Sequence, residues 1–139
     1  FEMITPKSNG MKYGPLFVRP NALELPNGMH LKYPDLTYTR GEFIYKTERD
    51  YIRTHGPRLT ENVVQALARI VITDQMLDVQ SLPQVDIVLQ VHDEIIAIGS
   101  ETDSDATMKQ IIEIMRTPPE WCSDLPIDAE GGVSQVYDK

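Results

Sequence analysis

Two short apolar runs that flank a polar stretch constrain the fold of this chain more than any other feature. Residues 85–89 read Val-Asp-Ile-Val-Leu, and residues 95–98 read Ile-Ile-Ala-Ile. Both runs are short and rich in β-branched residues, which favours strands over helices. We therefore predict an antiparallel hairpin, with Asp93 at or near its turn and accessible to solvent.

The stretch between the two runs, residues 90–94, reads Gln-Val-His-Asp-Glu and places three ionisable side chains near the tip of the hairpin. These are His92, Asp93 and Glu94. Mg²⁺ takes one or two protein carboxylates and leaves room for substrate phosphates, so the pattern fits an oxygen-ligand metal site. From these residues alone, a solvated acidic turn is the alternative interpretation.

The segment before the hairpin has the periodicity of an amphipathic helix. Gly56-Pro57 marks a boundary and Thr60 is a good N-cap, so the helix is expected from Glu61 to about Val79. Its apolar positions repeat at i, i+3, i+4 and i+7: Val64, Leu67, Ala68 and Val71. A second face, whose alternative is a plain solvated surface, carries Asn62, Gln65 and Arg69.

A second helix and a last strand are expected after the hairpin. The helical repeat comprises Met108, Ile111, Ile112 and Met115, and Pro118-Pro119 ends it. Residues 127–132 are expected to form a short strand. The order helix, strand, strand, helix, strand predicts an α+β fold, with an antiparallel sheet and helices packed on one face.

We expect a separate, β-rich irregular segment over residues 1–56, before a second part over residues 57–139. Proline and glycine interrupt residues 1–20, which are predicted to be irregular. Two or three short antiparallel strands are expected between Leu23 and Tyr51, around a turn at Pro26-Asn27-Gly28.

Composition and charge narrow the class of protein. The 139 residues fit one domain, and 41% hydrophobic with 24% charged residues is ordinary for a globular protein. The single cysteine, Cys122, excludes an internal disulfide. No apolar run approaches the roughly 18 residues of a membrane span, so no membrane contact and a cytoplasmic location are expected. Because the chain begins with Phe1 and not Met, we expect it to be a piece of a longer protein.

The net charge of −8 argues against nucleic-acid binding by the whole surface, but the charge is unevenly distributed. Up to Gln75 there are ten Lys and Arg against eight Asp and Glu, whereas from Met76 there are three against thirteen. Phosphate contacts are therefore expected from the first half, or from other parts of a longer protein.

Three segments together resemble the palm of family A DNA polymerases, and their sequences are most similar to those of the bacteriophage and prophage branch. Residues 90–94 resemble motif C, the strand-turn-strand of that palm. Residues 59–68, Leu-Thr-Glu-Asn-Val-Val-Gln-Ala-Leu-Ala, resemble the helix that precedes motif C. Residues 125–132, Leu-Pro-Ile-Asp-Ala-Glu-Gly-Gly, resemble the closing palm strand. The resemblance extends from about Arg58 to Lys139.

This resemblance implies roles for the residues of the turn. Asp93 would be one of two palm aspartates that hold Mg²⁺ for nucleotidyl transfer, in a two-metal site completed by residues outside this chain. Glu94 either joins Asp93 or supports it without binding metal, because adjacent side chains on a strand point opposite ways. His92 would lie near the primer terminus, with a purely structural role as the alternative.

The resemblance also implies contacts with DNA along the first helix. Gln65 aligns with a glutamine of the family that reaches the minor groove. Hydrogen-bond acceptors occupy the same place there on every base pair, so this side chain can check base pairing without reading the sequence. Further candidates for contacts with the primer-template are Asn62, Arg58 and Arg69.

Motif A, with the other aspartate, and the fingers helix that grips the triphosphate have no counterpart in this sequence. The resemblance thus implies part of a DNA-directed DNA polymerase, a nucleotidyltransferase of DNA replication that is inactive as an isolated chain. Its partners would be primer-template DNA, dNTP and the missing polymerase segments, in the host cytoplasm if it is phage-encoded. Two alternatives are a non-catalytic palm-like remnant that binds DNA or protein, and a Mg²⁺-dependent phosphohydrolase built on Asp93 and Glu94.

Overall fold

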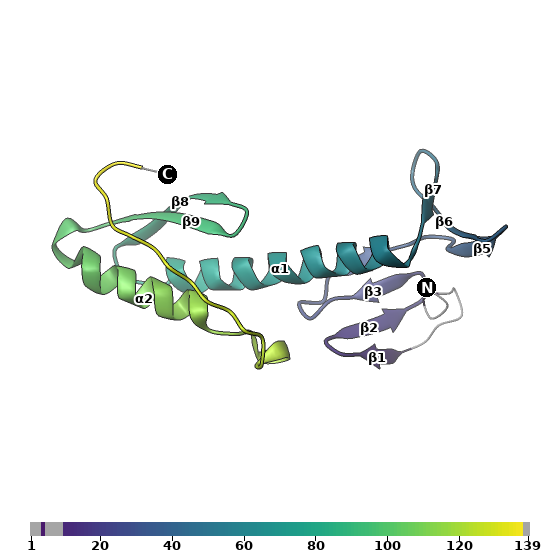
Figure 1. The fold of residues 1–139 in the computed structure, drawn as a ribbon, viewed down its shortest axis with the longest axis horizontal. Coiled ribbons are helices and arrows are strands. Elements are labelled where there is room, and N and C mark those ends of the chain that lie inside the picture. Colours follow the sequence, from purple (N-terminus) through teal and green to yellow (C-terminus); the bar gives the residue numbers. More distant parts are fainter. Residues whose placement is uncertain (1–3, 5–9, 138–139) are drawn as a thin grey trace. The chain divides into compact units, whose positions relative to one another are not determined.

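The computed structural model describes residue 4 and residues 10–137, and it confirms an α+β protein of helices and antiparallel sheets (Figure 1). The chain divides into two compact units, Phe1–Ala68 and Arg69–Lys139. The long helix α1, Gly56–Gln80, contributes residues to both units. Within the described ranges, no helix is both long enough and apolar enough to cross a membrane.

Two antiparallel sheets form most of the first unit. The first sheet runs in sequential order through β1 (Met11–Tyr13), β2 (Leu16–Arg19), β3 (Ala22–Glu24) and β4 (His30–Lys32). The second sheet, also in sequential order, contains β5 (Thr37–Thr39), β6 (Glu42–Lys46) and β7 (Tyr51–Thr54).

The prediction that residues 1–20 are irregular is wrong for residues 10–20, while residues 1–3 and 5–9 lie outside the described residues. Gly14, Pro15 and Pro20 lie in turns between strands and therefore do not prevent the strands from forming. Gly14 has a φ of 56° in the turn between β1 and β2, and Asn21, after Pro20, has a φ of 56° between β2 and β3. Gly adopts this left-handed region without steric cost, and Asn tolerates it.

The core of the first unit is an apolar cluster contributed by the strands and by the start of α1. Its buried members are Ile4, Val18, Leu23, Tyr33 and Leu36, and Leu59 and Val63 of α1 pack against them. The ring of Tyr45 meets that of Tyr33 edge-on, with centroids 5.3 Å apart. Burial raises the pKa of the Tyr33 hydroxyl.

Helix α1 begins earlier than the sequence predicts, at Gly56 and not Glu61. Pro57 is tolerated because the first turn of a helix needs no N–H from it. The imidazole Nδ1 of His55 accepts a hydrogen bond from the backbone N–H of Arg58 at 3.4 Å, so His55 caps the helix. Thr60, the predicted cap, lies within the helix and donates its hydroxyl to the carbonyl of Gly56 at 3.2 Å.

The buried face of α1 is also rotated from the predicted stripe. Val64 is 58% exposed, whereas Ile70 and Val79 are buried at 2% and 0% exposure. Val63, Leu67 and Ile70 satisfy the same i, i+4, i+7 spacing as the predicted set, and packing selects them. The stripe prediction is therefore wrong for Val64 and Ala68, which are exposed, whereas Leu67 and Val71 are partly buried.

The second unit contains the predicted hairpin and second helix. β8 (Val85–Val91) pairs antiparallel with β9 (Glu94–Gly99), with a bulge at Val88. A short 3₁₀ turn (Glu101–Asp103) leads into α2 (Ser104–Arg116), and another (Glu120–Cys122) follows it. Gln75 of α1 is buried and donates its Nε2 to the carbonyl of Met115 at 2.8 Å, which joins α1 to the end of α2.

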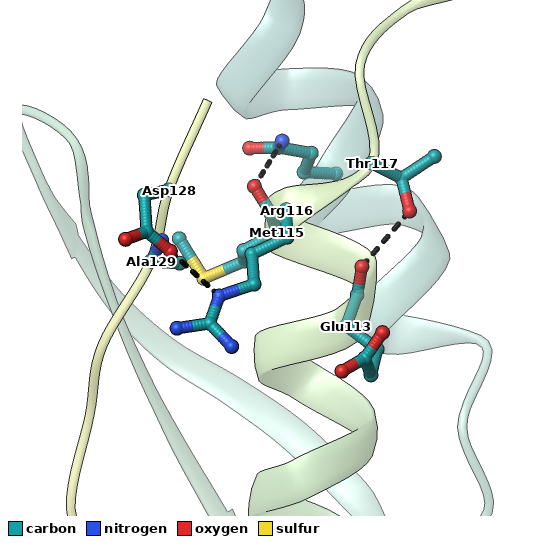
Figure 2. Close-up of polar contacts among 7 residues, drawn as sticks. Glu113, Met115, Arg116, Thr117, Asp128 and Ala129 are labelled. Carbon is teal, nitrogen blue, oxygen red and sulfur yellow. Dashed lines mark hydrogen bonds and ion pairs between the residues drawn. The ribbon is translucent and has the colours of Figure 1, made fainter. Parts of the chain in front are cut away.

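The strand predicted at residues 127–132 does not form, and this segment runs back along α2 instead (Figures 1 and 2). Arg116 donates its Nε to Asp128 at 2.7 Å. A Cβ at Gly131 would lie 2.1 Å from Cε of Met108, so the backbone passes close to the helix. The Asp128 carboxylate also accepts the N–H of Ala129 at 2.9 Å, a donor that a strand would offer to its neighbour.

Candidate functional site

The turn of the β8–β9 hairpin consists of two residues, His92 and Asp93, because Val91 pairs with Glu94. The prediction of an antiparallel hairpin with Asp93 exposed at its turn is confirmed. His92 has a φ of 54°, which two-residue turns require and which residues other than glycine rarely adopt. The backbone of His92 is therefore strained, a condition found often at ligand-binding and active sites.

Two hydrogen bonds of Gln90 connect this turn to α1. Gln90 donates its Nε2 to the backbone carbonyl of His92. The Oε1 of Gln90 accepts from Nη1 of Arg69 on α1 at 2.5 Å. The turn is thus tied to a long helix through a single side chain, which restricts its position relative to that helix.

The two carboxylates of the site are open to ligands. Asp93 and Glu94 are exposed, and neither forms an ion pair with another residue of the described ranges. Glu94 is the first residue of β9, so its position is set by pairing with Val91. Among residue 4 and residues 10–137, no group of three or more His, Cys, Asp or Glu is placed to hold a metal ion.

This donor set fits Mg²⁺ only as part of a larger site. Mg²⁺ keeps several waters and is often bound through one or two carboxylates and substrate phosphates. Asp93, alone or with Glu94, supplies that number of carboxylates on a fixed turn. A complete site needs further oxygen ligands from substrate or from other polypeptide.

The four predicted DNA contacts all lie on α1, in different environments. Arg58 is exposed in the first turn, and Gln65 is exposed with its Nε2 3.3 Å from Oε1 of Glu61. Asn62 is half-buried and donates its Nδ2 to the Tyr33 hydroxyl at 3.2 Å. Arg69 is exposed and is engaged by Gln90, as described above.

Sequence reasoning missed the role of Gln90. It placed this residue in the motif but assigned it no contact. Arg69 and Gln90 lie 21 positions apart, and no local periodicity links them. The available signal was the position of Gln90 two residues before a non-glycine residue in a tight turn, where a long polar side chain can reach the turn carbonyl.

Comparison with known proteins finds a relative among phage DNA polymerases. Over 130 residues the chain is 30% identical to the DNA polymerase of Bacillus phage SP02. The match covers 84% of this chain but 19% of that protein, so the chain spans about a fifth of the relative's length. No protein-family model matches the sequence, and no solved structure matches the chain. The chain is therefore related to a segment of a DNA polymerase.

Proposed function

We propose that this chain is a palm segment of a family A DNA polymerase of the bacteriophage and prophage branch, and that Asp93 is a catalytic metal ligand. The observation that carries this proposal is the exposed carboxylate of Asp93 on a two-residue turn braced by Gln90 and Arg69. The similarity to part of a phage DNA polymerase supports it independently.

In this function the turn residues have distinct tasks. Asp93 would hold Mg²⁺, which stabilises charge on the attacking 3′-oxygen and the leaving pyrophosphate during nucleotidyl transfer. Glu94 supports Asp93 electrostatically from the start of β9. His92 contacts the primer terminus, and Gln90 keeps the turn carbonyl in place. The rigid turn keeps the carboxylate from relaxing away as charge develops, which is how preorganised sites lower a barrier.

The helix α1 supplies contacts with primer-template DNA in this proposal. Gln65, exposed on the helix, reaches the minor groove and reports pairing geometry. Arg58, Asn62 and Arg69 contact the strand backbone or its groove edges. The dNTP and the second metal-binding carboxylate are held by polypeptide outside these 139 residues, so the isolated chain does not extend a primer.

A non-catalytic role is the second candidate, and one observation favours it. The described residues offer no cluster of three metal-ligating groups. A palm-like remnant that binds DNA or a protein partner would show the same hairpin without needing a charged Asp93.

Primer extension by the longer protein that contains this chain tests the proposal. Asp93→Asn keeps the size of the side chain and removes its charge, so the extension rate is expected to fall at least ~10³-fold. DNA affinity is expected to change little, because only one charge near the phosphates is removed. Asp74→Asn, an exposed aspartate on α1, is the matched control and is expected to retain the wild-type rate. A near-normal rate for Asp93→Asn would reject the catalytic role and favour the remnant.

A further inference from the structure

The first sheet has an outward face that combines cations with an aromatic ring. The strand register places four residues in one row across the sheet: Lys12, Phe17, Glu24 and His30. A neighbouring row on the same face contains Arg19 and Lys32, with Ala22 between them. Alternation along each strand directs Val18 and Leu23 to the opposite side, where they are buried in the core. We call this surface the outward face; its polar and aromatic members are Lys12, Phe17, Arg19, Glu24, His30 and Lys32.

The outward face is positive although the whole chain is acidic. It carries three permanent cations against one carboxylate, on a protein whose net charge is −8. Glu24 is engaged by Arg19 at 2.5 Å and lies 3.8 Å from Nε2 of His30, and the bond from Arg19 holds the pKa of Glu24 below its ordinary value. Lys12 and Lys32 are exposed and form no ion pair with a residue in the described ranges.

An exposed aromatic ring lies among these cations. Phe17 is 37% exposed, with Nζ of Lys12 5.8 Å and Cζ of Arg19 5.6 Å from its ring centroid. An open cavity of about 420 Å³ lies on the same sheet, and it shares Arg19 with the surroundings of the ring; its charged and titratable lining residues are Arg19, His30, Lys32 and Asp35. The ring thus offers a stacking surface once a base displaces a cation that lies over it, and Arg19 connects the ring to a cavity with three basic residues and one carboxylate.

We propose that the outward face binds single-stranded DNA, with a base stacked against Phe17 and a backbone phosphate in the cavity at Arg19 and Lys32. Proteins that bind single strands combine a positive groove with aromatic side chains, because every unpaired base presents a π-face. A duplex hides those faces within its stack, so it satisfies the cations but not Phe17. The assignment of the strand to DNA rests on the proposed polymerase function, whereas the charge and the ring do not.

Fluorescence anisotropy of a labelled oligo-dT measures this binding with the 139-residue chain, without metal or dNTP. Phe17→Ala is expected to weaken binding at least about 5-fold, which is the lower end of the effect of removing one stacked base. Lys32→Ala is expected to weaken binding and to reduce the slope of log K against log salt by about 0.7, one single-strand phosphate. Tyr38→Ala and Lys46→Ala alter an exposed aromatic and an exposed cation of the second sheet, and they are expected to change neither quantity.

Several outcomes would overturn the assignment. Equal affinity for duplex and single-stranded DNA, or unchanged binding by Phe17→Ala, would show that no base stacks on Phe17. A loss of affinity in the Tyr38→Ala control as large as in Phe17→Ala would show that binding is not located on the outward face. Tighter binding of oligo-U than of oligo-dT would reassign the face to RNA. Circular dichroism of each variant excludes unfolding as the cause of a loss. If the chain does not bind oligo-dT but primer extension by the longer protein depends on Asp93, only the binding role of the outward face is rejected. If oligo-dT binding depends on Phe17 but the Asp93→Asn protein remains active, only the proposed catalytic function is rejected.

Discussion

Arg69 and Gln90 are joined across 21 positions of sequence by a hydrogen bond from Nη1 of the arginine to Oε1 of the glutamine. Because Gln90 also donates to the carbonyl of His92, its amide connects a helix to a strained turn. The position of Asp93, the next residue, therefore depends on a helix that Gln75 joins to the end of α2.

Replacing Gln90 tests this connection. Gln90→Ala removes both hydrogen bonds and is expected to lower the free energy of unfolding by about 0.5–1.5 kcal/mol, with the exposed location favouring the lower value. In a double-mutant cycle with Arg69→Ala, the double variant should cost less than the sum of the two single variants. Urea denaturation measures the free energy of unfolding of each variant, and Gln110→Ala, at an exposed position of α2, is the control. Additive losses would show that the two side chains act independently.

Two substitutions at His92 can distinguish the effect of backbone strain from a role of the side chain in primer extension. Its φ of 54° costs a β-branched residue far more than glycine, so His92→Val is expected to destabilise the chain by about 1–2 kcal/mol. His92→Gly should be as stable as wild type or more stable, because glycine adopts this conformation freely. Denaturation of both variants measures the strain. If His92 contacts the primer end, His92→Gly will lose extension activity in the longer protein while remaining stable; full activity would leave His92 a structural residue.

Asp128 predicts how the C-terminal segment responds to acid. The N–H of Ala129 and the guanidinium of Arg116 together hold the pKa of Asp128 below its ordinary value. A carboxyl whose folded pKa is depressed stabilises the fold above its unfolded pKa and loses that contribution as pH falls through the folded pKa. The contact with α2 (Figure 2) is therefore expected to be complete at neutral pH and to loosen only below the ordinary range of an aspartate.

An NMR titration of the Ala129 amide measures this transition. Arg116→Gln should move the midpoint upward but only part of the way, because the N–H of Ala129 remains. High salt should shift the wild type in the same direction, since an exposed ion pair is screened. An unchanged midpoint in Arg116→Gln would mean that the arginine does not act on this carboxylate.

The sequence was sufficient where local pattern decides the structure. The hairpin follows from two β-branched runs, and the polar stretch between them, residues 90–94, places Asp93 at or near the turn. Helix α2 follows from a single unambiguous repeat. These elements need no knowledge of what they pack against.

The sequence was insufficient where several patterns compete or where partners are distant. Val63 and Val64 are both apolar, so two stripes on α1 are equally compatible with the sequence, and only contact with the core selects Val63. A histidine is seldom a helix cap, which hid the role of His55. The apolar and polar alternation after Pro126 is typical of a strand, but Asp128 takes the N–H of the following residue.

Asn62 and Gln65 lie three positions apart on α1 and differ in what surrounds them. Asn62 is half-buried and bonded to the Tyr33 hydroxyl, so Asn62→Ala is expected to reduce the free energy of unfolding by about 1 kcal/mol. Gln65 is exposed and its Nε2 lies 3.3 Å from Oε1 of Glu61, so Gln65→Ala should change stability by no more than about 0.5 kcal/mol.

Their effects on primer extension should reverse this order. In the proposed polymerase, Gln65 contacts the minor groove, and its loss deletes a hydrogen bond of about 1–3 kcal/mol that forms once DNA covers it. Because that contact reports pairing geometry, Gln65→Ala should slow extension of a matched primer and thereby reduce discrimination against a mismatched one. Asn62→Ala should affect matched and mismatched primers alike, at a temperature where the variant stays folded. Steady-state extension of both primers, with thermal denaturation of each variant, measures the contrast. If Gln65→Ala leaves the ratio of matched to mismatched extension unchanged, Gln65 does not read the groove, and the exposed face of α1 is a solvated surface.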